Sequence, residues 1–272
     1  MTHATGTKFL KDGSLPHMWC PGCGNGIVLA NMLRAFEESG YTKKNTVVVT
    51  GIGCWGKADD YLLTNALHTT HGRALAFATG IKAYNPKLNV VVLMGDGDGV
   101  TIGGNHFLHA ARRNIDLTAI VVNNCNYGMT GGQVSATTPS GSITSTTVYG
   151  NPERELDMCA IADIAGANYV ARGTAYHSWE LKNQIKEALN KKGFSLVEVV
   201  SPCPTHYGRY NDMKLAIEML DWLKEKGVSR EKYNKLTNPK ENGYFIIGKL
   251  TDRNEPDFNA RYEEVQSRAA GE

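Results

Sequence analysis

Two apolar runs that end in oxygen-bearing turns constrain this chain more than any other feature. The run Val90–Met94 leads into a Gly-Asp-Gly turn around Asp96, and the run Leu117–Val122 leads into an Asn-Asn pair that ends at Asn124. The spacing leaves room for one crossover helix, expected over Gly103–Asn114, between two parallel strands. Because open α/β sheets bind ligands at the carboxyl ends of their strands, the two polar side chains are expected to meet at a ligand site.

The residue types at this site suit a metal-bound diphosphate. Carboxylate and amide oxygens match Mg²⁺, which keeps other positions for water and phosphate. The glycines beside Asp96 let the backbone approach a pyrophosphate. A Gly-Asp-Gly turn alone is a common turn, but joined to the helix, the second strand and the Asn-Asn pair it resembles the thiamine diphosphate (TPP) motif.

The composition excludes several other classes of protein. The 272 residues are 42% hydrophobic and 21% charged, which is ordinary for a globular protein. A net charge of +2 gives no support to a nucleic-acid or acidic-membrane partner. Met1–Lys11 lacks the apolar core of a signal peptide, and no apolar run approaches the roughly 20 residues that span a bilayer. We therefore expect a cytoplasmic protein with no nucleic-acid and no membrane partner.

Strand and helix patterns alternate along the chain, which predicts an α/β fold with a doubly wound, mostly parallel sheet and helices on both faces. The serine- and threonine-rich stretch Gly131–Pro152 is expected to be a long loop. The other expected strands are Thr46–Thr50, Asn168–Ala171 and Ser195–Val200. The other expected helices are Ile27–Phe36, Arg73–Tyr84, Leu156–Ala165, Trp179–Leu189 and Asn211–Lys226.

The sequence patterns also predict which side chains of two helices face the core and which histidines lie in packing or surface positions. In Gly103–Asn114 the inward residues are expected to be Phe107, Leu108 and Ala111. The apolar face of Asn211–Lys226 is expected to be Met213, Ile217, Leu220 and Leu223. Packing or surface histidines in helical or pre-helical segments are expected to be His68, His106 and His109. From Val228 onward the chain is charged and irregular, and only Phe245–Ile247 suggests a further strand.

Four of the six cysteines fall where a metal centre can form. Cys20 and Cys23 make a Cys-x-x-Cys, which alone fits a redox dithiol, half a zinc site or half an iron–sulfur site. Cys54 follows the first strand and Cys203 follows the last, so both are expected at the carboxyl edge of the sheet. Spacing alone leaves a zinc ion and a [4Fe–4S] cluster as open alternatives. Cys159 is expected to be a small core residue.

Five separated motifs resemble the β subunit of the 2-oxoacid:ferredoxin oxidoreductases. They are Trp-Cys-Pro-Gly-Cys-Gly at 19–24, Gly-Ile-Gly-Cys at 51–54, His-Gly-Arg-Ala at 71–74, Gly-Asp-Gly-Asp at 95–98 and the segment 124–133. The resemblance implies a TPP-binding fold with Mg²⁺ and an attached [4Fe–4S] cluster, and thus iron over zinc. It implies CoA-dependent oxidative decarboxylation of a 2-oxoacid with ferredoxin as electron acceptor. The implied partners are an α subunit, with γ and ferredoxin-like δ subunits as further candidates.

The resemblance also assigns roles to residues and segments. The implied cluster ligands are Cys20, Cys23, Cys54 and Cys203. The implied Mg²⁺ ligands are the side chains of Asp96 and Asn124 and the carbonyl of Asn126. The implied catalytic or substrate-side residues are His71 and Met129, which also contact the cofactor. The other implied cofactor contacts are Ile52, Gly53, Gly72, Gly95, Gly97, Asp98, Gly128 and Thr130. Residues 1–210 are expected to form the TPP-binding and iron–sulfur domain, and residues 211–272 a C-terminal helix and extended tail on the body or on a partner subunit.

One part of the catalytic machinery is missing from the sequence. TPP enzymes need a carboxylate against the aminopyrimidine, and in this family the partner subunit supplies it. Glu153 and Glu155 follow the serine- and threonine-rich loop and are expected to be solvated. The chain alone is therefore expected to be catalytically incomplete.

The resemblance favours 2-oxoglutarate as substrate and succinyl-CoA and CO₂ as products. Met129 stands where pyruvate-specific relatives tend to have asparagine, and His-Ala-Ala-Arg-Arg-Asn at 109–114 resembles the 2-oxoglutarate branch. Candidates to meet the distal carboxylate are Arg73, Lys57 and Arg209. Pyruvate and branched-chain 2-oxoacids remain alternatives.

Two functions from other classes stay open. A non-oxidative TPP decarboxylase or synthase would use the cysteines only structurally, and the positions of Cys54 and Cys203 argue against it. A non-catalytic zinc-binding assembly subunit would have a degenerate cofactor cleft, and the intact Asp96 and Asn124 pair argues against that.

Overall fold

The computed structural model describes residues 7–271, and a seven-stranded sheet in the order β2-β1-β3-β4-β6-β5-β9 forms its centre. Neighbouring strands pair in parallel except β9, which is antiparallel to β5. The strands are β1 (Thr46–Thr50), β2 (Asn65–His68), β3 (Asn89–Gly95), β4 (Thr118–Asn123), β5 (Tyr169–Thr174), β6 (Ser195–Val200) and β9 (Gly248–Asp252). A second, small sheet consists of β7 (Gly227–Val228) and β8 (Phe245–Ile246).

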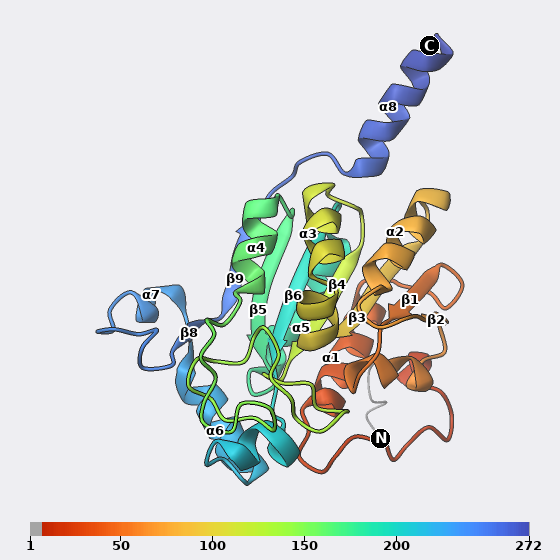
Figure 1. Cartoon of the computed structure of the whole chain (residues 1–272). Helices are drawn as coiled ribbons and strands as arrows, with labels where there is room; N and C mark the ends of the chain where they lie inside the picture. Colours follow the sequence, from red (N-terminus) through yellow and green to blue (C-terminus); the bar gives the residue numbers. More distant parts are fainter. Residues whose placement is uncertain (1–6, 272) are drawn as a thin grey trace.

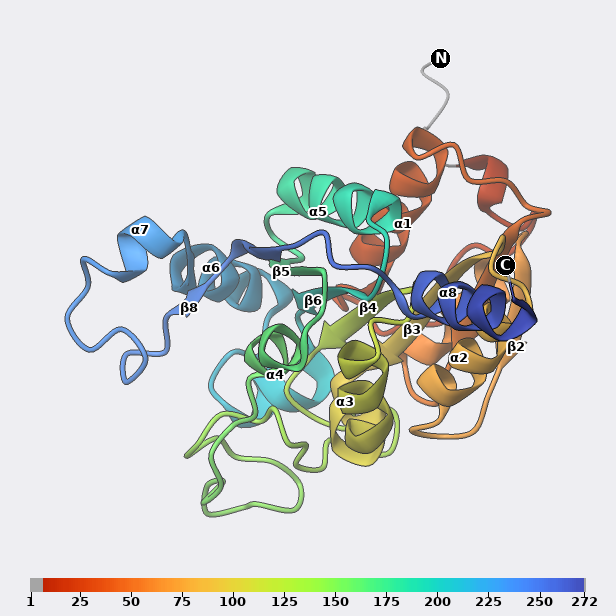
Figure 2. The ribbon, with the colours of Figure 1, turned by 90° about the horizontal axis from the view of Figure 1, so that it is seen from above.

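Helices cover both faces of the large sheet, as Figures 1 and 2 show. One face carries α1 (Asn25–Glu38) and α5 (Ser178–Asn190). The other carries α2 (Ala74–Tyr84), α3 (Gly104–Arg112) and α4 (Met158–Ala165). The remaining α-helices of the described chain are α6 (Ala216–Lys226), α7 (Arg230–Tyr233) and α8 (Phe258–Ala270). The predicted doubly wound, mostly parallel α/β fold is confirmed.

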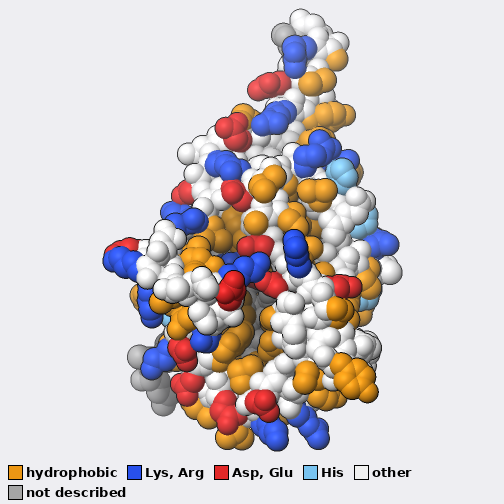
Figure 3. All heavy atoms as spheres, turned by 60° about the vertical axis from the view of Figure 1, so that its left-hand side comes forward, with side chains coloured by type: hydrophobic (Ala, Val, Ile, Leu, Met, Phe, Trp, Pro, Cys, Tyr) orange, Lys and Arg blue, Asp and Glu red, His pale blue; other side chains and the backbone are white. Residues whose placement is uncertain are grey.

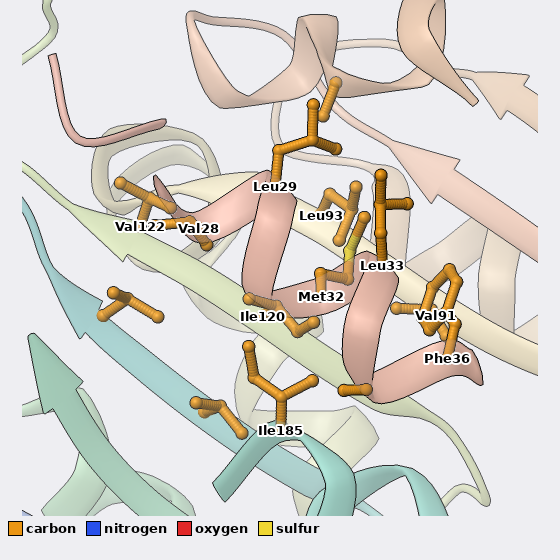
Figure 4. Close-up of a cluster of buried hydrophobic side chains, with 14 of the residues drawn as sticks. Val28, Leu29, Met32, Leu33, Phe36, Val91, Leu93, Ile120, Val122 and Ile185 are labelled. Carbon is orange, nitrogen blue, oxygen red and sulfur yellow. The ribbon is translucent and has the colours of Figure 1, made fainter. Parts of the chain in front are cut away.

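The apolar runs predicted as strands are buried from both sides. Along β3, Val91 and Leu93 pack under α1, while Val90, Val92 and Met94 face the α2 and α3 side. Figure 4 shows α1 directing its apolar side chains onto β3 and β4. Each fully buried side chain of this size contributes about 1.5–3 kcal/mol relative to exposure. This double burial explains why the strands read as continuous apolar runs.

The prediction that Leu108 faces inward is wrong. Leu108 is 42% exposed, whereas Phe107, Ala110 and Ala111 are buried. Residues 107, 110 and 111 share one stripe of the helix, and Leu108 lies about 100° around the axis from Phe107. The apolar pattern predicts the helix but not the edge of its buried stripe.

The helix predicted over 211–226 begins only at Ala216, because the chain first turns at Asp212, whose φ is 57°. Ile217, predicted to be on the apolar face, is 59% exposed. Met219 instead takes the buried position, where it packs against Gly208. The contact with the segment before the helix decides which side is buried.

Several elements of the described chain had no sequence signal. His68, predicted in a helical or pre-helical segment, lies on β2, whose side chains are all exposed. Strand β9 comes from the charged tail and extends the sheet at β5. Helix α8 has no buried side chain and stands clear of the body (Figure 1), although the N–H of Phe258 donates to the Asn114 carbonyl at 3.1 Å.

No described helix combines the length and apolar character needed to cross a bilayer. On the face shown in Figure 3, basic and acidic side chains are interspersed, so neither sign forms a continuous patch there.

Candidate active site

A cavity that opens to solvent lies at the carboxyl ends of β1, β3 and β4. Its position is the edge at which open parallel sheets bind ligands. The predicted contact residues that line it are Ile52, Gly53, His71, Gly95, Asp96, Gly97, Asp98, Asn124, Asn126, Gly128, Met129 and Thr130. Gly72 lies behind this lining, where its N–H donates to Asp98 Oδ1 at 2.7 Å. The structure thus brings the predicted cofactor residues together in one place.

Oxygen atoms of the predicted Mg²⁺ ligands converge at the floor of the cavity. One end of the Asn124 amide lies 2.8 Å from Asp96 Oδ1 and 2.9 Å from the Asn126 carbonyl oxygen, and in the orientation that suits a metal ion the amide oxygen occupies this end. These three acceptors repel one another unless a cation lies among them. Rotation of the Asn124 amide gives the alternative, in which its nitrogen donates to both oxygens.

The second oxygen of Asp96 is held by hydroxyl groups that the sequence did not identify. Ser135 and Thr137 each donate to Asp96 Oδ2 at 2.6 Å. Burial raises the pKa of Asp96 to about 6, although these hydroxyls act in the opposite direction. Both come from the predicted long loop, whose wealth of serine and threonine was the available signal. The loop therefore fixes the carboxylate so that Oδ1 points at the Asn124 side.

His71 is positioned at the cavity by a buried carboxylate. Its Nδ1 lies 2.6 Å from Asp98 Oδ1, which also accepts the N–H of Ile52 at 3.2 Å. With Nδ1 engaged by a carboxylate, Nε2 remains as the acceptor nitrogen. The edge of the Tyr127 ring meets the His71 ring, with their centroids 6.0 Å apart. Asp98 therefore positions the His71 ring, a role beyond the predicted contact of Asp98 with the cofactor.

Tyr127 is a lining residue that the sequence did not single out. Its hydroxyl donates to the Gly97 carbonyl at 3.2 Å. A Cβ at Gly97 would lie 2.3 Å from the Tyr127 ring, so only glycine fits there. The other lining residues are Asn25, Trp55 and Val122, which were not predicted, and Cys54, which was predicted as a cluster ligand.

None of the four predicted cluster cysteines is in a disulfide, and Cys20, Cys54 and Cys203 each contribute to the electrostatic environment of Cys23. Burial raises the pKa of Cys23 to about 12 and that of Cys54 to about 11, and the neighbouring cysteines add to both shifts. No three of the four sulfur atoms lie within 4.8 Å of one another. The indole N–H of Trp19 donates to the Cys54 carbonyl at 2.6 Å, which joins the Cys-x-x-Cys segment to the loop after β1.

Cys54 belongs both to the lining of the cavity and to the four predicted cluster cysteines. It lines the cavity together with the predicted TPP contacts. It also lies within electrostatic reach of Cys20 and Cys203. Cys159 lies apart from both, in the core as predicted, and is 2% exposed.

The three cationic candidates for a substrate carboxylate do not line the cavity. Lys57 pairs with Asp60 at 3.4 Å. Arg73 is exposed and donates to the Gly72 carbonyl at 3.2 Å, and Arg209 is exposed. Met129 lines the cavity and is 45% exposed at its mouth.

Comparison with known proteins agrees with this geometry. The family described as thiamine pyrophosphate enzyme, C-terminal TPP binding domain, matches residues 28–199. The 2-oxoglutarate synthase subunit KorB of Methanocaldococcus jannaschii is 48% identical over 251 residues, which are 92% of this chain and 93% of that protein. The 2-oxoacid:ferredoxin oxidoreductase subunit beta of Saccharolobus solfataricus is 46% identical over 197 residues, which are 72% of this chain and 63% of that protein. The chain belongs to the β-subunit family of the 2-oxoacid:ferredoxin oxidoreductases.

A solved structure of this family has the same fold. It is the 2-oxoglutarate:ferredoxin oxidoreductase from Magnetococcus marinus with 2-oxoglutarate, coenzyme A and succinyl-CoA bound. The match has a TM-score of 0.87 at 30% identity and covers 100% of this chain and 93% of that one. The family membership predicted from the motifs is confirmed, and the chain is a subunit of an oxidoreductase with a TPP-binding domain.

Proposed function

We propose that this β subunit carries TPP, Mg²⁺ and a [4Fe–4S] cluster in a complex that converts 2-oxoglutarate and CoA to succinyl-CoA and CO₂ and reduces ferredoxin. The observation that carries the proposal is the double position of Cys54, which lines the cofactor cavity and is close enough to Cys20 and Cys203 for their charges to raise its pKa. A cluster held there adjoins the cofactor, so electrons have a short path out of the cavity. The Methanocaldococcus relative is named for 2-oxoglutarate, and the Magnetococcus enzyme binds it.

The three converging oxygens support Mg²⁺ as the ion that anchors the diphosphate. Octahedral Mg²⁺ with ligands at 2.0–2.1 Å places adjacent ligands about 2.9 Å apart. The distances from the Asn124 oxygen to Asp96 and Asn126 are 2.8 and 2.9 Å. Asp96, Asn124 and the Asn126 carbonyl would thus hold the ion together, and it would keep further positions for phosphate and water.

The spacing of the cysteines favours an iron–sulfur cluster over a zinc ion. In a tetrahedral zinc site with Zn–S bonds of about 2.3 Å, the sulfur atoms lie about 3.8 Å apart. No three of the four sulfurs approach within 4.8 Å. The alternative that remains is a larger centre that accepts one thiolate from each cysteine, and its ligands would be Cys20, Cys23, Cys54 and Cys203.

When bound, TPP supplies the electron sink for decarboxylation, and the chain's own residues orient it and move protons. The acidic side chains among the described residues lining the cavity are Asp96 and Asp98. Asp96 is held by hydroxyls and faces the Asn124 side, and Asp98 accepts from His71. A carboxylate for the aminopyrimidine would therefore come from a partner subunit, and so would the group for the distal carboxylate unless Arg73 turns inward.

His71 is proposed to exchange a proton at Nε2 with the reacting groups. Replacement by asparagine in the assembled complex is expected to lower kcat by about 10²–10⁴-fold, the usual worth of a general acid or base. Because the converging oxygens that would hold the diphosphate stay in place, the dissociation constant of TPP should change far less than kcat, by no more than the loss of one side-chain contact. Steady-state kinetics and calorimetric titration with TPP check the two parts. An unchanged kcat would remove His71 from the proton path.

The substrate assignment is tested on the complex purified without air. Ferredoxin reduction is followed with 2-oxoglutarate, pyruvate and a branched-chain 2-oxoacid, each with CoA. We expect kcat/KM to be at least about tenfold higher for 2-oxoglutarate, because one good polar contact to a carboxylate is worth about 1.5–3 kcal/mol. Preference for another 2-oxoacid would contradict the substrate, and product formation without any electron acceptor would favour a non-oxidative enzyme.

A further inference from the structure

A buried charged network lies behind the turn that holds the converging oxygens. Glu198 is 3% exposed in the middle of β6, where its neighbours along the strand are apolar. Arg172 on β5 donates from Nε to Glu198 Oε2 at 2.6 Å and from Nη2 to Asp157 at 2.6 Å. Cys159 donates from Sγ to the same Glu198 oxygen at 3.1 Å. On this side of the network the Arg172 guanidinium is therefore paired with the carboxylates of Glu198 and Asp157.

The other oxygen of Glu198 reaches the end of β4. The Asn123 side chain donates from Nδ2 to Glu198 Oε1 at 2.8 Å. The Asn123 Oδ1 accepts the backbone N–H of Cys125 at 3.0 Å. Asn123 therefore joins the buried carboxylate to the backbone of the next turn.

That turn has a backbone conformation that needs support. Cys125 has φ of 61°, in the left-handed region that costs a non-glycine residue about 1–2 kcal/mol. Two contacts hold it, since its N–H reaches Asn123 and its carbonyl accepts Thr138 Oγ1 at 2.7 Å. The residues on either side of it are Asn124 and Asn126, which supply two of the three converging oxygens.

We propose that Asn123 and Glu198 are positioning residues that hold this turn in the geometry required for Mg²⁺ and hence for the diphosphate. Neither lines the cavity, so neither touches the cofactor. Stability alone does not explain the network, because apolar residues of similar volume often replace a buried ion pair without loss. Hydrogen bonds that orient metal ligands are typically worth 10–100-fold in metal affinity. The inference rests on the proposed function, since it requires that the site binds the metal.

The test measures metal and cofactor binding rather than turnover. In the assembled complex stripped of TPP and metal, Mn²⁺ is titrated by its paramagnetic resonance signal in the presence of excess TPP, and thermal unfolding is recorded in parallel. Asn123→Ala is expected to weaken Mn²⁺ binding by about 10–100-fold. Asn31→Ala is the matched control, because Asn31 on α1 is another buried amide and donates from Nδ2 to Ser178 Oγ on α5 at 2.9 Å. The control should lower the melting temperature and leave Mn²⁺ affinity unchanged.

An exchange of donor and acceptor separates positioning from simple loss of packing. Asn123→Asp alone faces Glu198 with a second carboxylate and should weaken Mn²⁺ binding. When Asn123→Asp is combined with Glu198→Gln, the new amide donates to one oxygen of the new carboxylate, while the other oxygen still accepts the Cys125 N–H. The double variant is expected to recover Mn²⁺ affinity to within about threefold of wild type, a coupling that only interacting residues show. If Asn123→Ala does not fold, the comparison of Asn123→Asp with the double variant provides the test.

The outcomes are distinguishable. Wild-type affinity in Asn123→Ala, or a double variant that recovers its melting temperature but not its affinity, would overturn the positioning role and leave the proposed function standing. A wild-type complex that binds neither Mn²⁺ nor TPP would overturn the proposed function together with this inference.

Discussion

Replacing Asp96 with asparagine is expected to abolish Mg²⁺-dependent TPP binding and to stabilise the cofactor-free protein at the same time. The binding loss follows because the variant loses the charged oxygen that faces Asn124. The gain in stability follows because Asp96 is 1% exposed and its pKa is raised by burial to about 6. An asparagine keeps an acceptor for the hydroxyls of Ser135 and Thr137 and offers a donor to the Asn124 oxygen.

The stability effect of Asp96→Asn has a defined pH dependence. The folded pKa lies above the ordinary value of 3.8, so the folded state is penalised as pH rises from about 4 to about 6, and the full penalty persists above that. The shift corresponds to at most about 3 kcal/mol. Thermal unfolding of the cofactor-free complex should therefore favour the variant at pH 7.5 and show little difference near pH 4. A variant that binds TPP like wild type, or that is less stable at pH 7.5, would contradict the role given to Asp96.

Replacing Cys54 with serine is expected to remove the cluster and ferredoxin reduction while TPP stays bound. Cys54 is the cysteine that lines the cavity, and its thiolate would be one of four ligands. The converging oxygens of Asp96, Asn124 and Asn126 are untouched by the change, so the dissociation constant of TPP should stay within a few-fold of wild type. Iron content, TPP content and ferredoxin reduction of the anaerobic complex measure the separation.

The matched control for Cys54→Ser is Cys159→Ala. Cys159 is a buried thiol, whereas Cys54 is partly buried, and Cys159 lies in the core beside Glu198. The control should keep its full iron content and its visible absorbance. A Cys54→Ser complex that also keeps them would show that Cys54 is not a ligand.

The local parts of the fold and site could be predicted, because each depends on a short stretch of chain. Strands such as β3 and β4 follow from apolar runs buried on both faces, and the turns after them follow from the chemistry of Asp96 and Asn124. The strand β6 was predicted with its observed bounds, Ser195–Val200.

The parts that depend on distant contacts could not be predicted. Ser135 and Thr137 hold Asp96 from a loop that has no periodic pattern. The faces of α3 and α6 were misjudged at Leu108 and Ile217, because neighbouring segments decide which side of a helix is buried. Strand β9 lies in a charged tail and gains its place only by pairing with β5. Glu198, a lone acid within an apolar strand, was a visible signal for the network behind the metal turn.

The most direct test of the account is the content of iron, acid-labile sulfide, zinc and TPP in the complex purified without air. We expect about four irons, about four sulfides and one TPP for each copy of this chain after subtraction of clusters in other subunits, with broad brown absorbance that Cys54→Ser removes. Zinc or no metal at these cysteines, in protein never exposed to air, would contradict it.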